Sequence, residues 1–336
     1  MTSGSWAGGN AAGTIGIDNI IGNWQQNSNL GDRIRKGTMV CATFGRTADY
    51  SLNWGITLYG TTKNCTVQNN YVHDQWDSGN HSANSANIML FSYSSNNIIE
   101  NNTTDGKGII NGGIGSKGGF TDNNIIRYNL IKNAINGVWI TSSTSETDYS
   151  NDNTVYQNIF VNCSNAAVGE PHAVRRTTVY NNTAYNVLRF FGGWKDNLVG
   201  NQLYNNIAVG SRGITRAISF SGYNAGDCFT FLAPTVDYNC FNGFTSWWYR
   251  AMLPTQAWDR ATFQSNCSFD AHSMTSDPKF VNPSGGDFHL RSDSPCRNAG
   301  KNGITIGAYI TGNETIGYTP PGGLSDTSRS EKRRRE

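Results

Sequence analysis

The densest group of side chains that could carry out acid–base chemistry lies at residues 170–176. The run Glu170-Pro171-His172-Ala173-Val174-Arg175-Arg176 combines a carboxyl, an imidazole and two guanidinium groups. It follows an apolar segment typical of a strand, and binding residues concentrate in the turns after strands. Lys117 and Lys195 stand at comparable turns before and after the run. A charged turn in contact with water is the alternative interpretation of the same composition.

These residue types match the requirements of β-elimination at a uronate sugar. That reaction needs a base for the proton at C5, a cation that neutralises the carboxylate and an acid for the leaving oxygen. His172, Arg175 and Lys195 are the candidates for these roles, and Lys117 is a further catalytic candidate. Glu170 could orient His172 or join a calcium site. Calcium takes about six to eight oxygen ligands, and no Asp/Glu cluster of that density is visible, so no metal is assigned.

Aromatic side chains between the charged segments could bind a sugar. Trp139 and Trp194 lie near apolar residues that we expect to face inward, so their rings would point outward. The Trp-Trp-Tyr run at residues 247–249 is expected to form an aromatic loop with the same capacity. Further contacts to a bound sugar are expected from Arg176, Arg189 and His73. Alternatively, the tryptophans cover the outside of a sheet.

The elements that must position these residues repeat along the chain. Each repeat has an apolar pair, an Asn, and a second Asn or Asp about four positions later. The first Asn falls at 70, 102, 129, 158, 182 and 201, which gives spacings of 32, 27, 29, 24 and 19 residues. Self-similarity at such a period indicates a solenoid.

The local pattern predicts the kind of solenoid. The repeated units are short, rich in β-branched and aromatic residues, and alternate with period two. Gly, Asn, Asp and Ser separate them. Asn residues at the same place in stacked coils, about 4.8 Å apart, can hydrogen-bond to one another as a ladder. We therefore predict an all-β, single-stranded right-handed parallel β-helix.

Other repeat folds fit less well. A β-propeller needs blades of about 40 to 45 residues, which is longer than these spacings. A leucine-rich repeat needs Leu where this chain has Asn, Val and Ile. A β-sandwich gives no reason for Asn residues in register.

Composition excludes several other classes of protein. The 336 residues carry a net charge of +2 and only 15% charged side chains, so no bulk attraction to nucleic acid is implied. No apolar stretch approaches the roughly 20 residues that span a bilayer, so no membrane span is expected. The first five residues, Met-Thr-Ser-Gly-Ser, do not resemble a signal peptide.

Seven cysteines are scattered along the chain without a C-x-x-C pair or zinc-type spacing. Cys65 and Cys163 lie inside repeats and are expected as small buried apolar residues. Two pairings, Cys228–Cys240 and Cys267–Cys296, are possible in an oxidising compartment, and the sequence does not decide between bonded and free thiols.

Three parts of the chain follow from these patterns. Residues 1–63 are expected to form irregular coils or an N-terminal cap, because an open end coil exposes unpaired backbone groups. Residues 64–310 are expected to form the β-helix and its C-terminal closing segment. Residues 311–336, which are polar and end in a basic run, are expected as a disordered tail.

The sequence after residue 276 contains four phrases in a row that resemble a known superfamily. They are Asp277-Pro278-Lys279-Phe280-Val281-Asn282-Pro283, Gly286-Asp287-Phe288-His289-Leu290, Ser294-Pro295-Cys296-Arg297-Asn298-Ala299-Gly300 and Gly307-Ala308-Tyr309. They are similar to the C-terminal closing segment of the pectate-lyase-like right-handed β-helix proteins. The Asn repeats resemble the parallel β-helix repeat of the same group, so the resemblance covers roughly residues 64–310.

This resemblance implies a protein that acts on or binds a polysaccharide, outside the cell or at its surface. The superfamily contains lyases, hydrolases, epimerases, adhesins and phage tailspikes, so it indicates fold more specifically than chemistry. We expect a polysaccharide lyase-like enzyme that acts on a uronate-containing chain. The alternative from a different class is a non-catalytic glycan-binding surface protein or a phage tailspike-like protein.

Two further enzyme classes on the same fold stay open. A glycoside hydrolase needs two carboxylates across the scissile bond, for which Asp105, Asp122 and Glu170 are the candidates. The stretch Gly169-Glu170-Pro171-His172 resembles the G-x-D-P-H motif of the β-helical mannuronan C5-epimerases. Here Glu170 replaces the Asp of that motif, and the residue between the Gly and the acid is missing.

Overall fold

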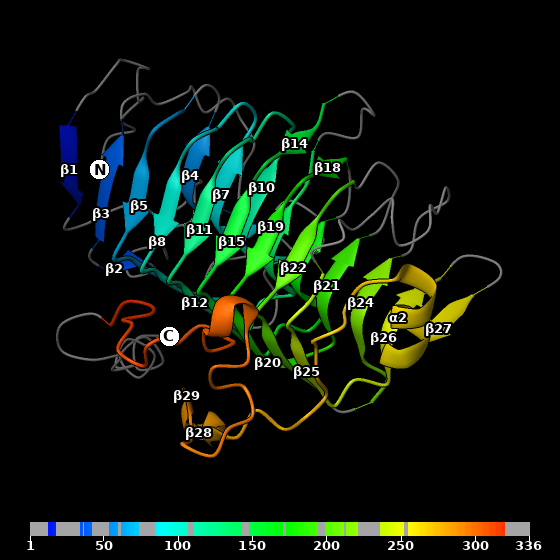
Figure 1. Cartoon of the computed structure of the whole chain (residues 1–336). Coiled ribbons are helices and arrows are strands. Elements are labelled where there is room, and N and C mark those ends of the chain that lie inside the picture. The colour runs from blue at the N-terminus through cyan, green and yellow to red at the C-terminus, as the bar shows by residue number, and fades with distance from the viewer. Residues whose placement is uncertain are drawn as a thin grey trace, which may run out of the picture.

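The structure is a computed structural model that describes residues 13–17, 34–35, 37–41, 54–59, 62–73, 85–106, 111–142, 148–170, 173–193, 199–211, 213–220, 236–251 and 255–319. Within these residues the chain is almost entirely β-structure, with one α-helix, α2 (Arg260–Cys267). Short parallel strands stack into three sheets that together form a parallel β-helix (Figure 1). The predicted fold class is confirmed.

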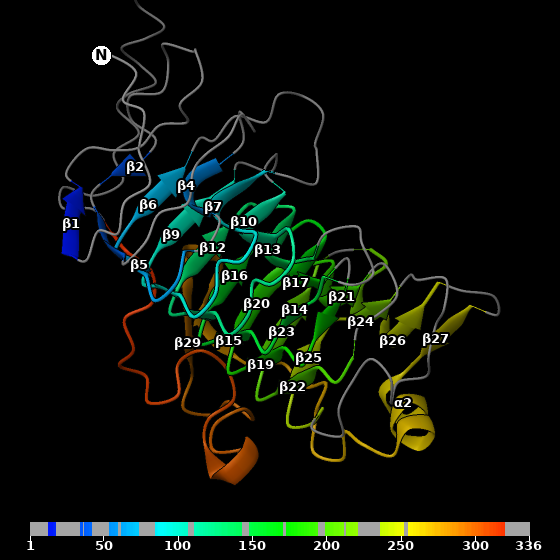
Figure 2. The same ribbon diagram turned by 90° about the horizontal axis from the view of Figure 1, so that it is seen from above.

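A full turn of the β-helix contributes one strand to each of three sheets, in the chain order C, A, B (Figures 1 and 2). Sheet A contains β5 (Thr66–Gln68), β8 (Ile98–Glu100), β11 (Ile125–Arg127), β15 (Thr154–Tyr156), β19 (Thr178–Tyr180) and β22 (Gln202–Tyr204). Sheet B contains β6 (Tyr71–His73), β9 (Thr103–Asp105), β12 (Leu130–Lys132), β16 (Ile159–Val161), β20 (Thr183–Val187), β23 (Ile207–Gly210) and β25 (Cys240–Asn242). Sheet C contains β4 (Trp54–Tyr59), β7 (Ala86–Phe91), β10 (Gly112–Lys117), β13 (Asn136–Ile140), β17 (Ala166–Glu170), β21 (Arg189–Gly193), β24 (Arg216–Phe220) and β26 (Ser246–Arg250).

Apolar side chains stack in columns inside the β-helix. In sheet A the middle residue of each three-residue strand is buried, and in register these are Val67, Ile99, Ile126, Val155, Val179 and Leu203. Successive residues of a strand point to opposite faces, so the first and third residues of these strands face outward. One coil cannot bury its apolar face alone, and stacking supplies the missing cover.

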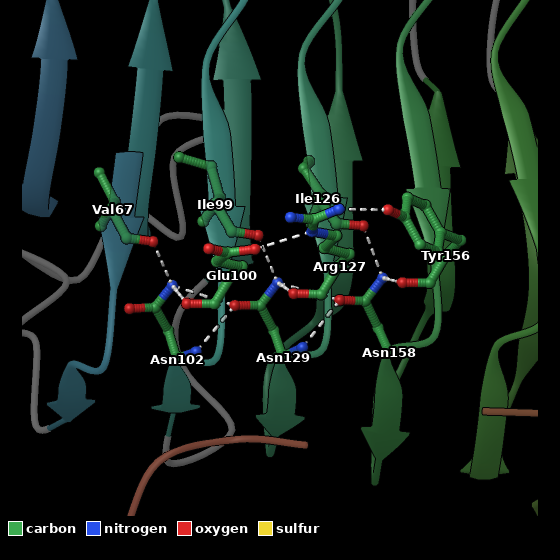
Figure 3. A network of polar contacts seen from close by, with 9 residues as sticks. All are labelled: Val67, Ile99, Glu100, Asn102, Ile126, Arg127, Asn129, Tyr156 and Asn158. Atoms are coloured by element: carbon green, nitrogen blue, oxygen red, sulfur yellow. Dashed lines mark hydrogen bonds and ion pairs between the residues drawn. The ribbon is translucent and has the colours of Figure 1, made fainter. Parts of the chain in front are cut away.

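The two-residue corner between sheets A and B holds a buried ladder of Asn side chains (Figure 3). The side-chain nitrogen of Asn102 donates to Glu100 O and to Val67 O of the preceding turn, both at 2.9 Å. The Asn102 backbone N–H donates to Asn129 Oδ1 of the next turn at 2.9 Å, and Asn102 Oδ1 accepts from the Asn70 N–H at 3.1 Å. One amide therefore satisfies polar groups in three successive turns.

Among the described residues this ladder continues through Asn70, Asn102, Asn129, Asn158, Asn182, Asn206 and Asn239. The repeat pattern places Asn201 in the ladder, and that assignment is wrong, because Asn206 occupies the rung. Asn201 lies at the corner between sheets C and A, where its Oδ1 accepts from the Thr177 N–H at 3.0 Å. The same corner has a second ladder, through Asn97, Asn124 and Asn153.

The second Asn or Asp of the predicted repeat forms an outer ladder where the sheet B strands end. Asn133 Nδ2 donates to Asp105 Oδ1 at 3.0 Å, Asn162 to Asn133 at 3.0 Å, and Asn186 to Asn162 at 2.8 Å. Asn133, Asn162 and Asn186 have positive φ, a conformation that Asn tolerates better than most residues.

The C-terminal closing segment, residues 277–309, covers the outer face of sheet B (Figure 1). It contains β28 (Phe280–Asn282), η1 (Pro283–Gly285), β29 (Asp287–Leu290) and η2 (Lys301–Gly303). Phe280, Phe288 and Ile306 form one buried cluster with the outward residues Ile159 and Ile207 of sheet B. These outward residues of sheet B therefore face protein instead of water.

Elements that are not parallel strands lie at both ends of the β-helix. At the N-terminal end β1 (Gly13–Ile17), β2 (Ile34–Arg35) and β3 (Gly37–Cys41) pair antiparallel with one another or with β5 and β6. At the other end β27 (Gln256–Trp258) pairs antiparallel with β26, and Phe263 of α2 stacks on Trp248 with ring centroids 5.6 Å apart. These elements cover strand edges that would otherwise be open to pairing.

The parallel strands extend slightly beyond the predicted boundaries. β4 already pairs in parallel with β7, so the β-helix includes residues before 64. Residues 311–319 lie on the β-helix, because the Gly317 N–H donates to Tyr128 O at 2.7 Å and the Tyr318 N–H to Thr103 Oγ1 at 2.8 Å. The remainder of the predicted tail lies outside the described residues. In the part of the chain that is described, no helix has the length and apolarity to cross a membrane.

Replacing Asn129 by Asp should destabilise the protein by more than about 3 kcal/mol. The change removes the Nδ2 donor that serves Ile99 O and Arg127 O, each at 2.8 Å, and leaves an acidic group against these carbonyl oxygens in a fully buried position. Chemical denaturation of the wild type and the variant measures the loss in unfolding free energy, provided that both have the same dependence on denaturant concentration.

Asn162→Asp is the matched control, because it makes the same chemical change in the exposed outer ladder. It should cost less than about 1 kcal/mol. Similar losses for Asn129→Asp and Asn162→Asp would contradict the dependence of the fold on the buried ladder.

Candidate functional site

Sheet C brings three of the predicted site residues, Lys117, Trp139 and Arg189, to one face of the β-helix. A core residue of each strand points inward, from Ile88 in β7 to Trp248 in β26. The next residue along the strand faces outward, and in register these are Met89, Gly115, Trp139, Gly169, Gly192, Ser219 and Tyr249. We name this outer surface the sheet C face; its strands form the row from β4 to β26 in Figure 2.

Two arginines stand in register where β21 and β24 begin, and both side chains reach the sheet C face. The Arg189 side chain lies beside the outward Gly192, and the Arg216 side chain lies over the outward Tyr249. Arg189 pairs with Arg216 across these neighbouring strands, which lie about 4.8 Å apart. The Arg216 guanidinium lies 3.5 Å from the centre of the Tyr249 ring, a cation–π contact. Arg189 Nη1 donates to Asn165 Oδ1, and Asn165 in turn donates to Asn136 Oδ1 at 2.9 Å. A fourth amide ladder, through Asn111, Asn136 and Asn165, therefore ends at the arginine pair.

The arginine pair places two positive charges side by side on this part of the sheet C face. Burial lowers the pKa of Arg189, and the nearby charge of Arg216 lowers it further. The outward positions of sheet C that the structure describes contain no Asp or Glu. Like charges opposite each other destabilise a sheet, so an anion bound between Arg189 and Arg216 would offset that repulsion.

Lys117 and Trp139 form a second cluster on the same face. Lys117 Nζ lies 5.9 Å from the centre of the Trp139 ring, and burial lowers the pKa of Lys117. The Trp139 side chain is only 4% exposed and packs with Ala86 and Met89. It thus covers the outside of the sheet, as in the alternative interpretation, and does not present an open ring to a sugar.

The two cationic clusters do not converge on one reacting centre. Lys117 lies on β10, three strands from β21 in sheet C. The residue of β10 in register with Arg189 is Gly112, and Lys117 is five positions further along that strand. At about 4.8 Å per strand and about 3.3 Å per residue, the two side chains are on the order of 20 Å apart. They can contact a long ligand together but cannot act on the same bond.

Glu170 lies inside the β-helix and not in an exposed turn. It is the last residue of β17 and is fully buried, in register with the inward positions Ile140 and Phe220 of neighbouring strands. Burial raises the pKa of Glu170 to about 8, and the nearby Thr177 hydroxyl lowers it by a smaller amount. Neither carboxyl oxygen has a hydrogen bond of normal geometry. The predicted surface role for this carboxyl therefore does not match its position.

The two arginines of the 170–176 run lie at the corner between sheets C and A. The Arg175 guanidinium stacks on Tyr149, 3.3 Å from the ring centre. Arg176 is exposed and donates from Nε and Nη2 to the two carboxylate oxygens of Asp152, each at 2.7 Å. The Arg176 contact lowers the pKa of Asp152. The run therefore does not form one site: Glu170 points inward, and both arginines lie at the corner.

Three predicted site residues, His172, Trp194 and Lys195, lie outside the described residues. His73 is described and lies on sheet B, where it stacks on Tyr71 with ring centroids 4.4 Å apart. It therefore lies on a different face of the β-helix from Arg189 and Lys117.

The aromatic run at residues 247–249 is a strand and not a loop. Trp247 and Trp248 belong to β26 and are 3% and 1% exposed, in the core of the last turn. Only the third residue of the run, Tyr249, faces outward and supports Arg216. The predicted sugar-binding surface at this run is thus reduced to Tyr249.

The sequence contained a signal for Arg216 that the prediction missed. Arg189 precedes the core residue Phe191 by two positions, and Arg216 precedes the core residue Ile218 by the same interval. Alignment of the two strands on these core residues would have placed both arginines in one column.

A row of tyrosines on sheet A was also missed. Tyr156, Tyr180 and Tyr204 occupy the outward third position of successive strands and stack with ring centroids 4.8 and 5.1 Å apart. Arg127 donates to Tyr156 Oη at one end of the row, and Lys301 lies 5.0 Å from the centre of the Tyr204 ring at the other. Ring faces inside the stack contact each other, so the row stabilises the sheet and leaves ring edges and hydroxyls outward.

The candidate carboxylates of a hydrolase do not meet. Asp105 ends a strand of sheet B, Asp122 lies at the corner between sheets C and A, and Glu170 is in the core. In the part of the chain that the structure describes, no three His, Cys, Asp or Glu side chains are grouped as metal ligands.

Comparison with known proteins finds no matching family, no similar curated protein and no similar solved structure. The β-helix is therefore established by the strand pairing itself. The finer resemblance to the pectate-lyase-like superfamily rests on the sequence phrases of the closing segment and on the Asn repeats.

The buried carboxyl of Glu170 should make stability depend on pH. Because the folded pKa of about 8 exceeds the ordinary value of 4.5, the folded state holds a proton that the unfolded state releases. The contribution of protonated Glu170 to the free energy of unfolding is fully present below about pH 4.5. It is lost as pH rises through 8, and the total loss is on the order of 3–5 kcal/mol. Thermal unfolding midpoints between pH 5 and 9 measure this loss.

Glu170→Gln keeps the shape of the side chain and removes its titration. Its midpoint should vary less with pH than that of the wild type over the same range, and it should be the more stable of the two at pH 9. A variant that keeps the wild-type pH dependence would show that another group is responsible.

Proposed function

We propose that this chain binds an acidic polysaccharide along the sheet C face and cleaves it by β-elimination. The observation that carries the proposal is the register-matched pair Arg189 and Arg216, half-buried on a face whose described outward positions contain no carboxylate. Lys117 adds a third cation further along the same face. A ligand that contacts all three must be both anionic and extended.

The chemistry of the arginine pair favours carboxylate groups as ligands. Guanidinium groups bind carboxylates through two parallel hydrogen bonds and keep their charge when partly buried. The amide ladder behind Arg189 and the Tyr249 ring beneath Arg216 hold the two groups in place. Less side-chain freedom is then lost on binding.

The resemblance to the pectate-lyase-like β-helix proteins supports the same class of ligand. It also supports a location outside the cell or at its surface. Because that superfamily includes proteins that only bind glycans, the resemblance supports the ligand more than the reaction.

In the proposed reaction Arg189 and Arg216 neutralise the uronate carboxylate, which makes the proton at C5 more acidic. A base takes this proton, and the electron pair of the broken C5–H bond forms the C4–C5 double bond. The C4–O bond breaks at the same time, and an acid protonates the leaving oxygen. His172 and Lys195 stay the candidates for base and acid. The arginine pair replaces Arg175 in our assignment of the cation, because Arg175 is held on Tyr149 at the corner.

Arg189→Ala and Arg216→Ala should each weaken binding of polygalacturonate or alginate by about tenfold or more, since a charge-assisted contact contributes about 1.5–3 kcal/mol. Calorimetric titration at fixed salt measures the affinity. Arg176→Ala is the control, because it removes the same charge from an exposed ion pair at the corner. Equal weakening by Arg176→Ala would indicate general charge attraction and contradict a site at Arg189 and Arg216.

Incubation of the protein with pectate, alginate or a glycosaminoglycan should raise ultraviolet absorbance in the band of unsaturated uronates. His172→Ala and Lys195→Ala should abolish this rise while circular dichroism stays unchanged, and parallel reactions with a chelator test the need for calcium. Binding without any rise in absorbance across the panel would reject the lyase and leave the glycan-binding protein.

A further inference from the structure

Two buried thiols lie side by side where the closing segment covers the last strand of sheet B. Cys240 is the first residue of β25 and Cys296 belongs to the closing segment; both are fully buried in the same apolar cluster. The Cys240 thiol is within hydrogen-bond distance of the Cys296 thiol, and its Sγ lies 3.2 Å from Ser276 O. Both cysteines are free, whereas Cys267 is disulfide-bonded.

This arrangement overturns the two pairings considered from the sequence. Cys228–Cys240 and Cys267–Cys296 each require a cysteine that is free in the structure. The sequence separation of cysteines contains no information about which of them the closing segment brings together.

We infer that Cys240 and Cys296 form a disulfide when the protein folds in an oxidising environment, and that this bond fastens the closing segment to the β-helix. The two thiols share one buried cluster and one hydrogen bond, so an S–S bond of about 2.05 Å would join groups that are already in contact. Nothing in the inference depends on the proposed function.

The backbone on both sides of the pair is held in place. Beside Cys240, the Phe241 N–H donates to Met274 O at 3.0 Å. Beside Cys296, its own N–H donates to Ser294 Oγ at 3.2 Å and its carbonyl accepts from the Ile306 N–H at 2.9 Å. These bonds fix the backbone position of both cysteines before the S–S bond closes.

The oxidation can be written with a small disulfide such as oxidised glutathione as the oxidant. One cysteine thiolate attacks that disulfide and releases one glutathione thiolate; the second cysteine then attacks the mixed disulfide and releases the other. The two cysteines lose two protons and two electrons, and two glutathione thiols form. The protein needs no other redox partner.

The environment of the two thiols determines when the disulfide can form. The hydrogen bond to Cys296 and burial both raise the pKa of Cys240, so the reactive thiolate is scarce once the closing segment has docked. The bond should therefore form during folding and resist both oxidants and reductants afterwards. Closure of the loop between residues 240 and 296 should stabilise the docked segment by restricting the unfolded chain.

The test is refolding of the full chain in a glutathione redox buffer, followed by alkylation and peptide mapping without reduction. A peptide pair linked through Cys240 and Cys296 is expected. The thermal midpoint should rise on oxidation by about 5 °C more in the wild type than in Cys240→Ala or Cys296→Ala. Both variants keep Cys267, so its own bond contributes equally to every comparison.

Cys163→Ala is the control for loss of a buried thiol, since Cys163 lies in the core of the β-helix. Its midpoint should rise on oxidation as much as that of the wild type. Recovery of Cys240 and Cys296 as alkylated free thiols after oxidative refolding would overturn the inference. An oxidation-dependent rise in Cys240→Ala equal to that of the wild type would also overturn it.

Discussion

A tight corner leaves backbone groups that its own turn of chain cannot satisfy, and the buried amide ladder between sheets A and B solves this problem in every turn. Each ladder Asn donates to a carbonyl of its own turn and to one of the preceding turn, as Asn158 does to Tyr156 O and Ile126 O at 3.0 and 2.9 Å. An unsatisfied buried polar group costs about 1–3 kcal/mol. Regular stacking of the turns is therefore enforced at the corner, and the apolar columns then pack inside a frame of constant spacing.

Constant spacing also decides what form a functional site can take here. Residues at the same register position of neighbouring strands form a column, so Arg189 and Arg216 meet across one strand interval although they are 27 positions apart in the sequence. Residues adjacent in the sequence separate instead, as Glu170 and Arg175 do. Such a surface is suited to a ligand that runs along the stack. The outer face of sheet B is not comparable, because the closing segment covers it with an apolar cluster.

Much of the fold was predictable, whereas little of the candidate site was. The ladder was predictable from Asn70 to Asn182 because each rung is marked by its own Asn after an apolar pair. The prediction was wrong at Asn201 because the ladders at both corners are made of Asn. Only the strand pairing shows that Asn206 continues the ladder between sheets A and B. The prediction for Glu170 was wrong for a related reason. β17 extends one residue further than the apolar pattern indicates, so Glu170 is part of the strand and its carboxyl lies in the core. Trp247 and Trp248 lie in the middle of β26 and in the core of the last turn, so the predicted loop at this run is wrong.

The sequence by itself determined the architecture of this protein, because alternation of apolar residues and recurrence of Asn are local patterns that repeat with every turn. It also determined the residue types available for chemistry. Only the tertiary structure decided which of them face outward together, because register and strand ends depend on pairing between turns and not on the residues of any one turn. The contact between Cys240 and Cys296 depends in the same way on where the closing segment folds back, a long-range packing outcome that no spacing in the sequence encodes.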